Sequence, residues 1–140
     1  MANEAILRDR LEDAIDFTVA DGTGIEKGAI LQLTDPRTAI APTSAGVACA
    51  GIAAREKIAS DGRTRLAVYR KGIFDMYASG AITVGEPVMI ATTGTNINCV
   101  KAAGGITASG AVIIGHALET AADQETFQVY LDVGAGGVTV

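Results

Sequence analysis

The fold class is decided by one stretch near the end of the 140-residue chain, Phe127-Gln128-Val129-Tyr130-Leu131-Asp132-Val133. Its members alternate strictly, with the purely apolar residues at every second position. A period of two places the two sets on opposite faces of a β-strand. The stretch therefore predicts a strand with one buried face and one solvent-facing face.

Eight further runs upstream have a similar β-like character and are separated by Gly, Asp, Asn and Thr, which favour turns. Because the connections are too short for crossover helices, the strands are expected to be mainly antiparallel. The fold class predicted is all-β, a small barrel or sandwich. The eight runs are Ile15 to Ala20, Ala29 to Thr34, Val47 to Ala53, Thr64 to Tyr69, Gly72 to Ala78, Pro87 to Thr92, Ile97 to Lys101 and Ala111 to Leu118.

The pattern divides the chain into an N-terminal arm over residues 1–13, a single β domain over 14–133 and a Gly-rich C-terminal tail over 134–140. In the arm, Leu7, Leu11 and Ile15 recur at a spacing of four, which favours one or two amphipathic helical turns. A helix this short is marginal alone, so the arm is expected to order against the body or a partner. Inside the β domain the only helix expected is a turn or two over Ala53 to Ala59.

Internal repetition is limited to two similar corners. Ile25 precedes Gly28 by three positions, Ile82 precedes Gly85 in the same way, and each glycine opens a predicted strand. Two matching corners of one fold are favoured over a solenoid.

Hydropathy and charge constrain where the apolar surface goes. Mean hydropathy is +0.32 with only 19% charged residues, yet the longest uncharged stretch, Thr38 to Ala54, is too short and too rich in Gly, Ser, Thr and Pro for a membrane span. The charged first fifteen residues argue against a secretory signal. We therefore expect a soluble chain that buries apolar surface in a subunit interface.

A net charge of −5 disfavours nucleic-acid binding, which needs a basic patch. The one basic locality comprises Arg63, Arg65, Arg70 and Lys71. It is interpreted either as a solvated strand edge or as a patch for an acidic partner.

Candidates for chemistry are few. Cys49 and Cys99 are expected to be buried thiols, although one disulfide stays possible, and the single histidine, His116, is expected to be half-buried on an apolar strand face. Asp21-Gly22-Thr23-Gly24 lacks the spacing of a phosphate-binding loop and predicts a hairpin turn. No catalytic, cofactor-binding or metal-binding residues are predicted, and no small-molecule substrate is expected.

The order and spacing of several segments, over about residues 25 to 132, resemble those of a known protein family. They run from Thr64 to Phe74, Ile82 to Val88, Ile114 to Ala121 and Phe127 to Leu131, with Ile25 to Ile30 and Gly46 to Ala53 upstream. This series resembles the small capsid decoration, or cement, proteins of tailed bacteriophages. The resemblance implies a mostly β, noncatalytic virion protein, made in the host cytoplasm, that binds the outer surface of an icosahedral head. It also implies a homotrimer that bridges neighbouring major capsid proteins.

The first thirteen residues match no family motif. The capsid-contact hypothesis for Ile6, Leu7 and Leu11 rests on the apolar stripe in this charged segment and on the change to β-type alternation at Ala14. The arm is expected to dock as a short helix or as an added strand, and to be removable without unfolding the body.

Two other function classes stay open. One is a head-fibre or carbohydrate- or cell-surface-binding β module, which would use exposed aromatics among Tyr69, Phe74, Tyr77 and Tyr130. The other is a small hydrolase or carrier domain that uses Cys49 or His116.

Overall fold

The computed structural model describes residues 3–93, 96–103 and 112–133, and within these ranges it is all-β without a helix. The predicted fold class is therefore confirmed. None of the described segments is a helix long and apolar enough to cross a membrane. The predicted tail over 134–140 lies outside the described residues. The strands are β1 (Ile6–Arg10), β2 (Ile15–Thr18), β3 (Ile30–Thr34), β4 (Thr38–Ile40), β5 (Cys49–Ala53), β6 (Arg65–Tyr69), β7 (Lys71–Ala78), β8 (Pro87–Thr93), β9 (Asn96–Ala102), β10 (Gly115–Ala117) and β11 (Thr126–Asp132).

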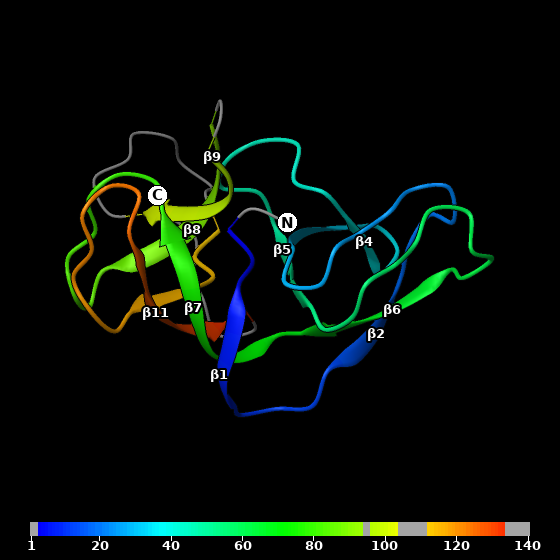
Figure 1. Cartoon of the computed structure of the whole chain (residues 1–140), viewed down its shortest axis with the longest axis horizontal. Helices are drawn as coiled ribbons and strands as arrows, with labels where there is room; N and C mark the ends of the chain where they lie inside the picture. Colours follow the sequence, from blue (N-terminus) through cyan, green and yellow to red (C-terminus); the bar gives the residue numbers. More distant parts are fainter. Residues whose placement is uncertain (1–2, 94–95, 104–111, 134–140) are drawn as a thin grey trace.

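The strands form two barrels side by side along the long axis of the molecule (Figure 1). Barrel I closes in the order β2-β4-β3-β5-β6. Barrel II follows the order β7-β11-β10-β8-β9 and closes because β9 also pairs with β7. Arg70 alone separates β6 of barrel I from β7 of barrel II, so the chain passes directly from one barrel into the other.

The two barrels share one topology. In each, the first strand pairs in parallel with the third and antiparallel with the fifth, as β2 does with β4 and β6 and as β7 does with β9 and β11. Their remaining pairings correspond as well. The chain is therefore an internal structural duplication.

The duplication extends to single hydrogen bonds. Ile25 and Lys57 exchange two backbone hydrogen bonds, 2.9 and 2.7 Å long, and Ile82 and Ala121 exchange two of 2.9 and 2.8 Å. Three residues after each isoleucine, Gly28 and Gly85 have φ values of 85° and 86°, which favour glycine. The two corners expected from the sequence are thus equivalent positions, 57 residues apart, in two copies of one fold.

Two large clusters of buried apolar side chains stabilise the two barrels. One fills barrel I around Phe17, Leu31 and Val68. The larger one fills barrel II around Phe74 and Phe127 and also takes in Ile30, Cys49 and Ile52 from the outer side of β3 and β5. All five residues of β5 are consequently buried, because the strand contacts the interior of barrel I on one face and barrel II on the other. A Cβ at Gly51, where φ is 137°, would lie 2.1 Å from the Tyr69 carbonyl oxygen, so only glycine fits this close approach.

Two local expectations are wrong, and one short strand was missed. The helical turns expected over Leu7 to Ile15 are replaced by β1, which pairs antiparallel with β7. The turn of helix expected over Ala53 to Ala59 is an irregular connection that bridges to Ile25 through Lys57. The sequence also gave no sign of β4, a strand of only three residues whose single buried member is Ala39.

The chain before β1 is anchored at the junction of the barrels by Asn98 of β9. Its side-chain amide donates to the carbonyl oxygens of Asn3 and Gly28, at 2.7 and 3.0 Å, and its Oδ1 accepts from the Ile30 N–H at 2.7 Å. Ala5 is 5% exposed and belongs to the larger core. Residues 3–10 are therefore integrated into the body and do not form a free arm in this structure.

Candidate functional site

The three predicted capsid-contact residues lie in or next to β1 but differ in exposure. Ile6 and Leu11 are 52% and 47% exposed, whereas Leu7 packs against the larger core. β1 is held on β7 by its backbone pairing and by a 2.7 Å ion pair between Arg8 and Asp75. The structure thus leaves Ile6 and Leu11 available for a partner and uses Leu7 for packing. A capsid contact by any of the three stays a prediction.

A cleft of about 490 Å³, which no sequence pattern predicted, opens beside the beginning of β2. The Phe17 ring forms its floor and is itself almost completely buried. The guanidinium carbons of Arg37 and Arg70 lie 5.6 and 5.7 Å from the ring centroid, which is within cation–π range. The residues that line the cleft are Ile15, Phe17, Leu33, Thr34, Asp35, Arg37 and Arg70.

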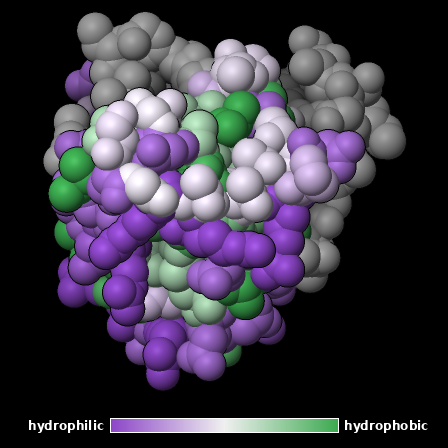
Figure 2. All heavy atoms as spheres, turned by 90° about the vertical axis from the view of Figure 1, so that its right-hand side faces the viewer, coloured by the Kyte–Doolittle hydropathy of each residue, from purple (hydrophilic) through white to green (hydrophobic). Residues whose placement is uncertain are grey.

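The predicted basic locality is divided between two surfaces. Arg63 and Arg65 line a hollow of about 280 Å³ on barrel I, together with Arg55. Arg70 lines the cleft beside β2, and Lys71 begins β7. Figure 2 looks onto the barrel I end, whose lower part is mostly hydrophilic with pale and green residues between. The four residues therefore do not form a single patch.

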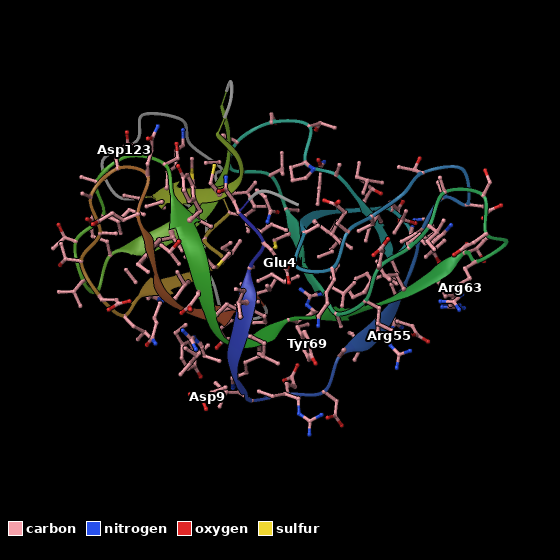
Figure 3. All side chains as sticks on the ribbon, viewed as in Figure 1. Glu4, Asp9, Arg55, Arg63, Tyr69 and Asp123 are labelled. Atoms are coloured by element: carbon pink, nitrogen blue, oxygen red, sulfur yellow. The ribbon has the colours of Figure 1, made fainter. Side chains whose placement is uncertain are left out.

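Charge is unequally distributed between the barrels. Residues 15–69 carry six acidic and six basic side chains, whereas residues 71–132 carry six acidic and only two basic ones. Arg63 and Asp123 lie at opposite ends of the long axis (Figure 3). The molecule is therefore polarised, with a strongly acidic barrel II.

Exposed apolar side chains on both barrels also indicate contact surfaces. Val84 and Leu118 of barrel II are 56% and 42% exposed. Their turns are joined by a 2.8 Å hydrogen bond from the Gly85 N–H to the Ala117 carbonyl oxygen, so the two side chains belong to adjoining turns. On barrel I, Ile58 is 62% exposed.

A buried lysine, Lys57, is the main polar feature that the sequence analysis missed. Its side chain has no exposed surface, and its Nζ lies 2.7 Å from an oxygen of Asp61 and 3.2 Å from one of Asp21. Nζ also donates to the carbonyl oxygens of Asp21 and Ile58. The Asp21-Gly22 turn thus binds this ammonium group, which joins the β2–β3 connection to the β5–β6 connection of barrel I.

The three candidates for chemistry, Cys49, Cys99 and His116, belong to three different strands, β5, β9 and β10. Cys49 and Cys99 are buried thiols, as predicted. Burial raises the pKa of the Cys49 thiol to about 12 and also raises the pKa of Cys99, so Cys49 stays protonated at neutral pH. His116 is exposed on β10 rather than half-buried, because Gly115 and Ala117 supply the inward positions of that strand. Among the described residues, no group of His, Cys, Asp and Glu side chains could hold a metal ion.

The aromatic candidates for a surface-binding module all belong to strands, not to loop tips. Phe74 is 1% exposed, and the Tyr69 ring packs against it with centroids 5.9 Å apart. Tyr77 and Tyr130 are only partly exposed, on β7 and β11. The carbohydrate-binding alternative therefore lacks the exposed platform that it would need.

Comparison with known proteins agrees with the resemblance seen in the sequence. A family model described as phage cement protein matches residues 10–133. A crystal structure of the N base of the head fibre gp8.5 of bacteriophage phi29 is similar in fold, with a TM-score of 0.53 and 15% identity, over 85% of this chain and 94% of that chain. No curated protein is significantly similar.

Proposed function

Since the chain belongs to the phage cement protein family and is thus a structural protein of the phage head, we propose that it binds the outer surface of the head as a homotrimer. There it bridges and stabilises neighbouring major capsid proteins without catalysis. The observation that carries the proposal is the family match, which covers both barrels.

The surface of the molecule supports this proposal. Among the residues that the structure describes, six large apolar side chains are exposed, namely Ile6, Leu11, Ile15, Ile58, Val84 and Leu118. They lie on both barrels and on the segment between β1 and β2, so contacts could form on several sides of one molecule. A protein that bridges subunits needs at least two separate contact surfaces, one for each neighbour.

Within the capsid-contact surface we place Ile6 and Leu11. Both are exposed close to β1, and β1 lies at the edge of its sheet with β7 on one side only. An edge strand with exposed apolar side chains is suited to docking against another protein.

The test is co-sedimentation of the purified protein with undecorated heads, followed by cryo-electron microscopy of the decorated particles. We expect saturable binding, density on the outer surface where capsid subunits meet, and greater resistance of decorated heads to heating. Heads that bind no protein, or density on the inner surface, would contradict the proposal.

A further inference from the structure

The duplication exposes a difference between two equivalent strand edges. On barrel II, β1 covers the first half of β7, where Ile6 pairs with Asp75 and Asp9 with Ile73. The parallel pairings of Thr18 with Thr38 and of Tyr77 with Cys99 make Thr18 equivalent to Tyr77. Asp75 therefore corresponds to Asp16 of β2 in barrel I, and no described strand covers β2 there. The chain thus fills this position on one barrel and leaves it open on the other.

The open edge lies along the cleft that contains Phe17. β2 meets β4 only at Thr18, where the Thr18 N–H donates to the Arg37 carbonyl oxygen at 3.0 Å. Ahead of that point β2 turns its Ile15, which is 39% exposed, toward the cleft. A strand added beside this part of β2 would enter the cleft and cover Ile15.

In the free protein Arg37 covers part of the edge. Its Nε donates to the Asp16 carbonyl oxygen at 2.9 Å, and Asp16 corresponds to Asp75, which pairs with Ile6 of β1 in barrel II. A charged side chain over an edge strand is a common protection against unwanted pairing. Because the Arg37 contact is a single exposed hydrogen bond, an incoming strand can replace it.

The charges of the cleft favour an acidic occupant. Arg37 and Arg70 both line the cleft over the Phe17 ring, and Asp35 is the only acid among the lining residues. A guanidinium released from Asp16 would pair with a carboxylate of the incoming strand, and such charge-assisted hydrogen bonds are the strong ones. The apolar part of the cleft would receive a neighbouring apolar side chain.

We propose that barrel I is a strand-addition site, in which an extended acidic segment of the major capsid protein pairs with the Ile15–Thr18 edge of β2 as β1 pairs with β7. This assignment rests on the proposed function, because it takes the head as the partner. Main-chain hydrogen bonds to β2 supply affinity, and the two arginines select an acidic segment.

The first experiment compares two charge-reversal pairs in the co-sedimentation assay. Arg37→Glu with Arg70→Glu alters the cleft, and Lys27→Glu with Lys101→Glu makes the same change in charge outside the cleft. We expect the cleft pair to weaken head binding about tenfold or more, since one lost hydrogen bond to a charged group corresponds to that factor. We expect the control pair to weaken head binding much less than the cleft pair does. Equal effects of the two pairs would contradict the proposal.

Hydrogen exchange on the wild-type protein tests the strand-addition site even if the Arg37→Glu, Arg70→Glu double variant does not fold. The Asp16 amide is expected to exchange more slowly on heads than in free protein, whereas the Ile73 amide, already under β1, is expected to be unchanged. A photo-cross-linker at Ile15 should join the major capsid protein, with Ile58 as the matched exposed control. No added protection over residues 15–18, or cross-links only to a second copy, would overturn the assignment.

These results separate the two levels of inference. Wild-type protein that does not bind heads contradicts the proposed function itself. Wild-type protein that binds heads with an unchanged β2 edge contradicts only the strand-addition site.

Discussion

At Lys57 the two barrels differ in chemistry, since the equivalent position in barrel II is Ala121. Lys57→Met keeps the length of the side chain but leaves the acceptors on Asp21, Ile58 and Asp61 without their ammonium donor. We expect a clear fall in melting temperature by circular dichroism. Lys27→Met, which removes an exposed charge, is the matched control and should melt close to wild type. A Lys57 variant as stable as that control would show that the buried charge contributes nothing.

The same residue sets a pH window for stability. The hydrogen bond from Lys57 lowers the pKa of Asp61 below its ordinary 3.8, so this contribution is present above that value and is lost as pH falls through the folded pKa. Burial alone would lower the pKa of Lys57, but the hydrogen bonds to Asp61 and Asp21 outweigh it and raise the pKa above 10.5. That contribution is lost as pH rises through the folded value. The stability difference between wild type and Lys57→Met should therefore be largest between these limits and shrink outside them. A difference independent of pH would contradict the ion pairing.

Cys49 and His116 test whether any head binding depends on a reactive group. Cys49→Ser places a hydroxyl in the core and is expected to cost about 1 to 3 kcal/mol of unfolding free energy, measured by urea denaturation. His116→Ala changes an exposed side chain and should cost little. Both variants are expected to bind heads as wild type does in co-sedimentation. Binding lost by either variant while it still unfolds cooperatively would reveal a site that we have interpreted as packing or surface.

At the scale of elements, β1 combines packing and docking, and its residues separate the two roles. Ile6→Ser with Leu11→Ser is expected to leave the melting temperature near wild type, because both side chains are exposed, and to reduce co-sedimentation with heads. Leu7→Ser is expected to lower stability by about 1 to 2 kcal/mol, because Leu7 packs against the larger core. Undiminished head binding by the double variant would place the capsid contact elsewhere. A chain that begins at Ala14 is a poorer test, since it also removes Ala5 from the core and uncovers β7.

The sequence predicts strands where burial alternates and misses them where it does not. β7 and β11 alternate along their whole length, and both were predicted within a residue or two of their ends. In β1 only Leu7 is partly buried, and a bulge between Leu7 and Asp9 breaks the period, so the spacing of Leu7, Leu11 and Ile15 resembled a helix face. The segment Ala53 to Ala59, which contains Lys57, was likewise predicted to form a turn or two of helix. The environment of Lys57 depends on Asp61 in the same connection and on Asp21, which the fold brings to it from the β2–β3 turn.

At the scale of the whole molecule, the duplication was visible in the sequence only as two corners. Backbone conformation and hydrogen bonding are retained at Gly28 and Gly85, while most side chains have diverged, as at Lys57 and Ala121. The cleft beside β2 could not be predicted at all. It exists because the position that β1 occupies on barrel II is unfilled on barrel I, which is a property of the three-dimensional arrangement.

The polarity of the molecule gives a specific expectation for its assembly. A ring of three copies requires a heterologous contact, in which one surface meets a different surface of the next copy. The acidic barrel II, with its exposed Val84 and Leu118, and the arginine-bearing end of barrel I are complementary in charge. We therefore predict a trimer in which the barrel II end of one copy meets barrel I of the next. Light scattering at micromolar concentration should give three times the 14.2 kDa chain mass.

The double variant Val84→Ser with Leu118→Ser is expected to shift this trimer toward monomer, because it removes the apolar part of the barrel II surface. The control is Leu11→Ser, which alters an exposed apolar residue next to β1 and is expected to leave the mass unchanged. Added salt should weaken association by screening the acidic and basic ends without abolishing it, since apolar burial persists at high ionic strength. A wild-type mass of one chain under these conditions would contradict the trimer in solution. A trimer that is insensitive to both the double substitution and salt would contradict this choice of surfaces, and the contact would then have to be sought away from the barrel II end.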